Sequence, residues 1–187
     1  MNLGKTLYVT DRKDWRLWLS KKYNKEKEIW LIYYRKSSHK PRIPYNDAVE
    51  EALCYGWIDS TLKGIDEEKF AQRFSPRRLK SKLSEMNKER IRQLIQKNKM
   101  TPMGLSVVKH LMDTSSKDLK LIIKKDILKY LKQDKKTWEN FQKFPESYKR
   151  VRVGWIESAR THSEIFNTRL RYFIKMTAKN KKYGMVQ

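Results

Sequence analysis

The sequence is poor in residues that build covalent, metal-bound or nucleotide-cradling sites. Its single cysteine, Cys54, excludes an internal disulfide and a zinc site made of cysteines. The three histidines are scattered, without the short spacings of metal ligands, and the six glycines form no phosphate-binding loop. We therefore expect no bound metal and no cofactor, and we assign no catalytic residue.

Long apolar runs are missing as well. No stretch approaches the about 20 residues that cross a bilayer, so we expect no membrane span. The first ten residues lack the apolar segment and the cleavage pattern of an export signal. We expect a cytoplasmic protein in which Cys54 is a buried, inert thiol rather than a nucleophile.

Basic residues outnumber acidic residues by two to one. There are 44 Lys and Arg against 21 Asp and Glu, a formal net charge of +23. A field of this sign attracts phosphates, nucleic acid or anionic membranes. Lysine, isoleucine, asparagine and tyrosine are all abundant, however, and an AT-rich genome produces the same bias. Two interpretations stay open: a specific polyanion as partner, or lysines spread evenly over a solvated surface.

The first part of the chain combines strands and helices. Four segments have the alternating or fully apolar pattern of strands: residues 7–10, 28–35, 57–62 and 69–74. The last two are predicted to form a hairpin through Gly64. We expect a small antiparallel sheet with helices on one face, in an α+β core domain over residues 1–115.

Capping residues mark the helices. Four helices are predicted to begin after polar caps or a cap followed by proline: Asp11, Asn46 or Asp47, Ser84, and Thr101-Pro102. Gly56 stands where a glycine ends a helix. Residues 116–187 show helical periodicity only, so we expect a helical C-terminal segment docked on the core.

Two neighbouring motifs carry the candidate site. Residues 52–59 (ALCYGWID) end a helix and begin a strand, and residues 74–78 (FSPRR) end a strand in a proline turn with two arginines. The helix predicted to start near Ser84 follows at once, and its free N–H groups favour an anion beside guanidinium groups. The residues predicted to bind an anion or nucleic acid are Trp57, Asp59, Arg73, Ser75, Arg77, Arg78, Lys80, Ser81, Ser84 and Asn87.

Several roles stay open for these residues. The turn is either an anion site or a solvated basic loop. Trp57 is either a core side chain or a platform on which a base stacks, and Asp59 is an arginine partner, a strand-end cap or a general base. The leading hypothesis is a non-enzymatic binder of a phosphate-rich partner, nucleic acid first. The second is an enzyme on a small anionic substrate, with Asp59 as base and Arg77 or Arg78 as clamp.

The C-terminal segment supports a third hypothesis. Residues 168–183 hold six Lys or Arg and no acid, interleaved with aromatic residues. Such a basic amphipathic helix either binds an acidic protein, which would make the chain an adaptor, or packs its apolar stripe on the core.

These segments resemble the YdeI/OmpD-associated family, also called bacteriocin-protection proteins. The resemblance rests on residues 51–59, 74–78 and 100–104 with Ser81, Ser84 and Asn87, and continues in Trp138, Phe141, residues 147–148, 155–160 and 168–169. It implies a bacterial-type cytoplasmic protein linked to stress or bacteriocin tolerance, and it brings no catalytic residues. The chain departs from the family at Leu83, where a tryptophan is usual, and in a longer spacing between Ala159 and Thr168.

Overall fold

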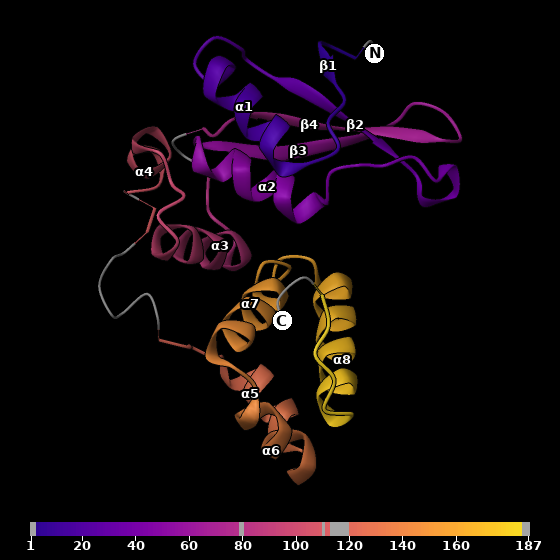
Figure 1. Ribbon diagram of the computed structural model, residues 1–187. Helices are drawn as coiled ribbons and strands as arrows, with labels where there is room; N and C mark the ends of the chain where they lie inside the picture. Colours follow the sequence, from indigo (N-terminus) through magenta and orange to yellow (C-terminus); the bar gives the residue numbers. More distant parts are fainter. Residues whose placement is uncertain (1–2, 79–80, 110, 113–119, 185–187) are drawn as a thin grey trace. The chain divides into compact units, whose positions relative to one another are not determined.

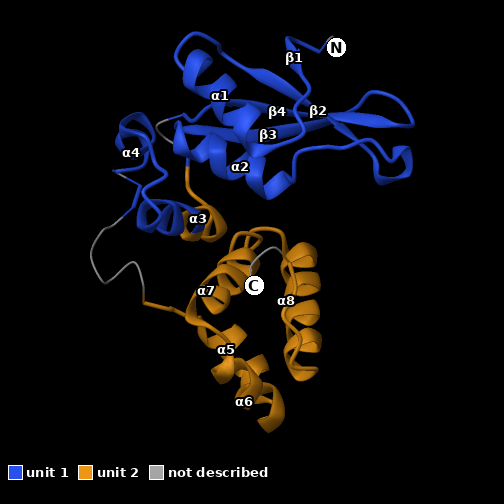
Figure 2. Cartoon of the chain, viewed as in Figure 1, with its two compact units in different colours: residues 1–81, 90–112 blue, residues 82–89, 113–187 orange. Residues whose placement is uncertain are grey.

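The computed structural model describes residues 3–78, 81–109, 111–112 and 120–184. The chain divides into two compact units, shown in different colours in Figure 2. The first unit comprises residues 1–81 and 90–112, and the second comprises residues 82–89 and 113–187. Helix α3 (Glu85–Gln96) contributes its start to the second unit and its remainder to the first.

The first unit contains a four-stranded mixed sheet with helices, so the predicted α+β class is confirmed (Figure 1). The strands are β1 (Thr6–Leu7), β2 (Ile29–Tyr34), β3 (Trp57–Gly64) and β4 (Lys69–Pro76), in the order β1-β2-β4-β3. The β3–β4 hairpin and both β4 pairings are antiparallel, whereas β1 runs parallel to β2. The sheet is therefore mixed rather than purely antiparallel, because helix α1 (Arg12–Lys22) forms the crossover that a parallel pair requires.

Strand register decides which side chains share a face of the sheet. Tyr33 lies opposite Phe70, and Asp59 lies opposite Phe74. The β3–β4 register shifts between Asp59 and Leu62, so this bulge brings Leu62 opposite Gln72. Helices α1 and α2 (Tyr45–Cys54) cover the sheet on the side of Phe74 and contact each other.

The aromatic core of the first unit lies between these helices and the sheet. Trp15 of α1 packs its ring 5.5 Å from that of Phe74 and donates a hydrogen bond to the Ala48 carbonyl of α2. Trp15 and Phe74 are both fully buried. The contacts therefore fix α1, α2 and the sheet as one core.

Most predicted helix ends are confirmed. The Asp11 carboxylate accepts from the backbone of Lys13 and Asp14, and Thr101 caps α4 (Pro102–Val108) in the same way. Gly56 follows α2 with a φ of 74°, a conformation that glycine adopts without strain.

The predicted cap of α2 is wrong. The helix begins at Tyr45 after Pro44, so Asn46 and Asp47 lie inside its first turn. Asn46 instead accepts a hydrogen bond from Arg90, 2.7 Å away. Pro44 itself occupies the N-cap position, and no side chain caps the first turn with a hydrogen bond.

The described remainder of the second unit is helical, as predicted. It contains α5 (Lys125–Lys132), α6 (Lys135–Lys143), α7 (Glu146–Glu157) and α8 (Ser163–Ala178). Helix α8 buries Phe166, Leu170 and Phe173 in the core of this unit. The apolar stripe of the basic C-terminal helix is therefore part of that core.

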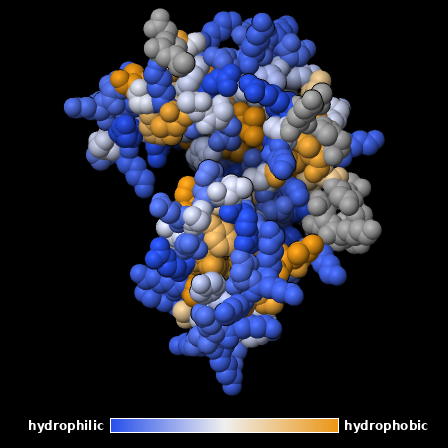
Figure 3. Space-filling model, turned by 180° about the vertical axis from the view of Figure 1, so that it is seen from behind, coloured by the Kyte–Doolittle hydropathy of each residue, from blue (hydrophilic) through white to orange (hydrophobic). Residues whose placement is uncertain are grey.

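Figure 3 shows one face, on which hydrophilic residues dominate and the hydrophobic patches are small and separate. Among the described residues, no helix combines the length and the apolar content that a membrane crossing requires.

Candidate functional site

Arg73, the first arginine predicted for the anion site, is engaged in an ion pair. Its Nε lies 2.7 Å and its Nη2 2.6 Å from Oε2 of Glu28, and Nη1 donates to Ser60. The hydrogen bond from Arg73 holds the pKa of the Glu28 carboxyl below its usual value. This carboxylate offsets the charge of Arg73, and the role of Arg73 as an anion ligand stays a prediction.

Arg77 and Arg78 point to different environments. Arg77 is 6% exposed, and its Nη2 donates to the Ser81 carbonyl at 3.1 Å. Burial lowers the pKa of Arg77. Arg78 is exposed, and its carbonyl accepts from the Ser81 hydroxyl at 2.7 Å, which closes the turn. Arg77 therefore helps to hold the turn together, and Arg78 faces solvent.

The rest of the predicted cluster is divided. Ser75 is half-buried on β4 opposite Ile58, and Lys80 lies outside the described residues. Ser84 and Asn87 belong to the second unit, where the Ser84 hydroxyl accepts from the Asn87 backbone at 3.2 Å and α3 begins next to it, as predicted. The gathering of the arginines around this helix start remains a prediction.

Trp57 lies in the core. It is 1% exposed, its indole N–H donates to the Tyr23 carbonyl at 3.0 Å, and its ring meets the edge of Trp18. Its ring has no exposed face on which a base could stack, as the core interpretation requires.

Asp59 lies beside a cavity in the first unit. Its Oδ2 accepts a hydrogen bond of 2.6 Å from the Tyr45 hydroxyl. Tyr45 belongs to the wall of this sheet cavity, which has a volume of about 530 Å³ and is lined by Tyr33, Arg42, Pro44, Tyr45, Leu62, Phe70 and Gln72. The arginine at this cavity is therefore Arg42, and Arg77 and Arg78 do not line it.

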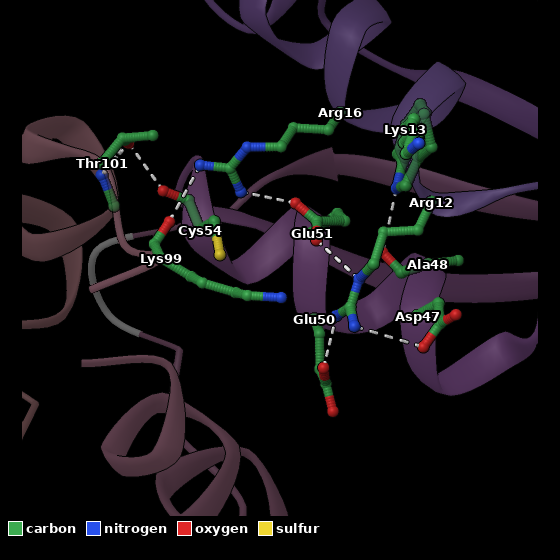
Figure 4. Close-up of polar contacts among 12 residues, drawn as sticks. Arg12, Lys13, Arg16, Asp47, Ala48, Glu50, Glu51, Cys54, Lys99 and Thr101 are labelled. Carbon is green, nitrogen blue, oxygen red and sulfur yellow. Dashed lines mark hydrogen bonds and ion pairs between the residues drawn. The ribbon is translucent and has the colours of Figure 1, made fainter. Parts of the chain in front are cut away.

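An ion-pair network around the buried Glu51 carboxylate ties α1 to α2 (Figure 4). The Glu51 carboxylate, 1% exposed, lies 2.7 Å from Arg12 and 2.6 Å from Arg16. Arg16 also donates to the Lys99 carbonyl at 3.0 Å, and the Thr101 hydroxyl donates to the Cys54 carbonyl at 2.6 Å. Because these contacts join α1, α2 and the segment before α4, the network has a structural role.

The predicted burial of Cys54 is confirmed. Its side chain is fully buried, and burial raises the pKa of the thiol to about 11. A thiol in this state reacts slowly because the thiolate is the nucleophile.

A second, larger cleft lies wholly in the second unit. This helical cleft has a volume of about 920 Å³. Its walls come from the start of α3, from α7 and from the C-terminal segment: residues 82–86, Val151, Arg152, Gly154, Trp155, Glu157, Ser158, Tyr172, Tyr183 and Gly184. Gly154 permits the close approach of α3, because a Cβ there would lie 2.4 Å from the Glu85 Cγ.

Arg152 is the most unusual group in this cleft. It is 5% exposed, and within the described residues it forms no ion pair and its Nε no hydrogen bond. Its guanidinium carbon lies 5.5, 5.8 and 4.7 Å from the ring centres of Tyr148, Trp155 and Tyr183. Rings offset part of the cost of burying this charge, but they leave its hydrogen-bonding capacity for an anion.

The two acids of the cleft carry their own partners. Glu157 pairs with Arg160 and lies 3.1 Å from Lys124, and Glu85 lies 2.9 Å from Lys88. The hydrogen bond from Arg160 lowers the pKa of the Glu157 carboxyl. These acids therefore oppose the charge of Arg152 less than free carboxylates would.

Two tyrosines, Tyr172 and Tyr183, line the same cleft, and a third, Tyr148, packs against Tyr183. Tyr172 is 45% exposed and meets the edge of Tyr183 at 4.8 Å. Burial raises the pKa of Tyr183 to about 12, so its hydroxyl keeps its proton at neutral pH. Tyr148 is buried, and its hydroxyl accepts from the Tyr183 backbone. Tyr172 thus offers an exposed ring next to buried hydroxyls and a buried cation.

Sequence reasoning missed Arg152, although a signal was present. Helical spacing places Tyr148, Arg152 and Trp155 on one face of α7, and the neighbouring Val151 and Val153 are buried. A basic residue on the buried side of a helix is rare unless it is paired, as the buried Lys149 of α7 is with Glu146.

Overall charge does not locate a site. The first unit has 23 basic and 11 acidic residues, a net charge of +12, and the second has 21 and 10, a net charge of +11. Within the described residues, no group of three or more metal-ligating side chains could hold a metal ion.

Comparison with known families places both parts of the chain. Residues 7–107 match the family described as "Domain of unknown function (DUF8412)". This range covers more than half of the chain. The chain belongs to the DUF8412 family. No curated protein and no solved structure matched it.

Residues 120–180 match the family described as "Bacteriocin-protection, YdeI or OmpD-Associated", which confirms the resemblance seen in the sequence. The match contains Arg152, Trp155 and Tyr172 of the helical cleft. The motifs at residues 51–59 and 74–78 lie instead within the range of DUF8412.

Proposed function

We propose that this chain is a binding protein for a phosphate-bearing ligand with a flat ring, a nucleotide either free or within single-stranded nucleic acid. The observation that carries the proposal is Arg152, a buried guanidinium without a carboxylate partner among the described residues, in the wall of a 920 Å³ cleft. The leading hypothesis from sequence, a binder of a phosphate-rich partner, is kept, and its site moves to the second unit.

The helix start beside Arg152 favours the phosphate. Ser84, Glu85 and Met86 line the cleft where α3 begins. The first N–H groups of a helix have no acceptor within the helix, and the helix dipole adds a partial positive charge there. A phosphate in this corner is favoured by N–H groups, by the guanidinium and by the Tyr183 hydroxyl.

The exposed ring favours the base. Tyr172 lines the cleft and is 45% exposed, so one part of its ring is available for stacking. Trp155 is less suited to this role because the guanidinium groups of Arg152 and Arg169 lie 5.8 and 4.7 Å from its ring centre. We therefore assign base stacking to Tyr172.

Titration of the full chain with adenosine monophosphate and with a labelled oligothymidylate tests this function. Tyr172→Ala should weaken both affinities about tenfold or more, since stacking of one base contributes about 1–3 kcal/mol. Arg152→Gln should have a larger effect on the phosphate-bearing ligands than on adenosine. Unfolding curves of both variants show whether the second unit is still folded.

Matched controls come from the same unit. Tyr130→Ala removes another tyrosine, 47% exposed, and Arg171→Gln removes an exposed arginine, both from outside the helical cleft. Neither should change the affinity for adenosine monophosphate. Equal losses in the cleft variants and their controls would refute a localised site, as would the absence of binding at low salt.

Salt distinguishes the two sources of ligand. An oligonucleotide that engages several phosphates should lose orders of magnitude in affinity between about 50 and 200 mM salt. The affinity for adenosine monophosphate should fall far less over the same range of salt concentration. If the oligonucleotide binds no more tightly than the mononucleotide at any salt concentration, the ligand is a free nucleotide.

A further inference from the structure

The sheet cavity of the first unit has its own aromatic wall. Register places Tyr33 opposite Phe70, and the two rings stack with centres 5.3 Å apart and planes 8° from parallel. The β-bulge brings Leu62 to the rim, where it is 59% exposed. A volume of about 530 Å³ lies within the usual range of small-molecule sites.

A buried hydroxyl in this wall has no hydrogen bond. Tyr33 is 3% exposed, and within the described residues its hydroxyl contacts no donor or acceptor. Burial raises the pKa of Tyr33, so the hydroxyl keeps its proton and can donate it. A folded chain rarely leaves a buried polar group unsatisfied, and a ligand in the cavity would satisfy it.

The same wall holds a cation with spare donors. Arg42 is half-buried, and its Nη1 donates to the Tyr34 carbonyl at 2.9 Å. No carboxylate among the described residues pairs with it, and a guanidinium has five N–H donors. Asp59 does not line the cavity, and it already accepts from Tyr45.

We propose that the sheet cavity binds a small ring-bearing carboxylate. The Arg42 guanidinium and the Tyr33 hydroxyl donate to the carboxylate, and Phe70 and Leu62 pack against the ring. This site is separate from the helical cleft, because all its residues belong to the first unit.

Ligand-observed NMR of the full chain with benzoate tests the proposal. Wild type should bind benzoate more tightly than acetate, which lacks the ring, and than benzyl alcohol, which lacks the charge. Arg42→Gln should lower the affinity for benzoate about tenfold or more and change the affinity for benzyl alcohol little. Only benzoate forms charged hydrogen bonds with the guanidinium. Tyr33→Phe should lower the affinity for benzoate by a smaller factor. This variant keeps the ring that packs on Phe70.

The control is Lys22→Gln, which removes one exposed charge of α1 outside the cavity. It should leave benzoate binding unchanged. Equal binding by Arg42→Gln and Lys22→Gln, equal affinity for acetate and benzoate, or no benzoate binding by wild type would each overturn the proposal. None of these outcomes bears on nucleotide binding, since no variant touches the second unit.

Discussion

Glu51 of the first unit and Arg152 of the second are both buried charged side chains, but their surroundings differ. In the first unit Glu51 lies between Arg12 and Arg16, and Arg73 is paired with Glu28. In the second unit Arg152 is nearly buried among rings, with no carboxylate partner in the described part of the chain. Paired charges hold elements together, whereas a buried charge without a counter-ion is a candidate for binding one.

The close contacts at helix glycines also differ between the two units. At Gly104 of the first unit, a Cβ would lie 2.1 Å from the Cys54 carbonyl oxygen, a backbone atom. At Gly154 of the second, it would lie 2.4 Å from Cγ of the Glu85 side chain. A backbone group cannot move without shifting its helix. Rotation of the Glu85 side chain relieves the contact with Cγ, and only the contact with its Cβ, 2.9 Å away, then requires a shift of the backbone.

Substitution of alanine for each of these two glycines should give the largest difference in the free energy of unfolding. Gly104→Ala should lower the free energy of unfolding by about 3 kcal/mol or more, since overpacking against backbone forces a shift of the helix. Gly154→Ala should cost about 1–2 kcal/mol, since a change of Glu85 rotamer relieves the closest contact and a small shift relieves the contact with Cβ. Denaturant unfolding measures both. Equal costs would show that the two contacts are equally rigid.

A suitable control is Gly64→Ala at the end of β3, where a Cβ meets nothing within 4 Å. This variant should stay within about 0.5 kcal/mol of wild type, as surface substitutions away from special features do.

Removal of the Glu51 carboxylate should have the next largest effect. Glu51→Gln leaves Arg12 and Arg16 without their buried counter-ion, and we expect a loss of about 2 kcal/mol. This lies below the usual cost of breaking a buried pair, because both arginines are partly exposed.

Glu50→Gln is the matched control, because Glu50 contacts the same Arg12 but is 26% exposed. It should cost less than about 1 kcal/mol. If both variants unfold at the same denaturant concentration, burial of Glu51 adds nothing, and the contrast with Arg152 disappears.

Acidification should slightly lower the stability of the second unit, because it protonates the carboxylates that pair with Arg160. Hydrogen bonds from Arg160 lower the pKa values of Asp126 and Glu157. A carboxyl with a lowered folded pKa contributes stability above its unfolded pKa, about 4, and loses it as the pH falls through the folded value. Since the Arg160–Asp126 pair is partly exposed, we expect these contacts to contribute less than about 1 kcal/mol to the free energy of unfolding.

Unfolding midpoints of wild type and Arg160→Gln between pH 6 and pH 3 measure this contribution. The variant should lose less stability on acidification than wild type. Parallel curves would mean that Arg160 does not support these carboxylates.

Local patterns in the sequence predicted much of the fold. The six apolar residues of β2, the β3–β4 hairpin, the Asp11 and Thr101 caps and the left-handed Gly56 follow from neighbouring residues. Backbone geometry and short-range hydrogen bonds decide such features, so periodicity and capping rules reach them.

Partners distant in the sequence could not be predicted. Arg73 meets Glu28 and Tyr45 meets Asp59 only through strand pairing and helix packing. The basic turn therefore read as a free cationic site, although the fold had a carboxylate beside Arg73. The helical spacing around Arg152 gave a signal of its burial, but its contact with the Tyr183 ring joins residues distant in the sequence.

A proton–nitrogen NMR titration of the full chain with adenosine monophosphate would show residue by residue whether the helical cleft binds a nucleotide. We predict shifts concentrated on the backbone N–H groups of Glu85 and Met86, on the Trp155 indole and on Tyr172, and their loss in Arg152→Gln. Shifts dispersed over exposed lysines of both units, with the helical cleft unchanged, would contradict binding at Arg152.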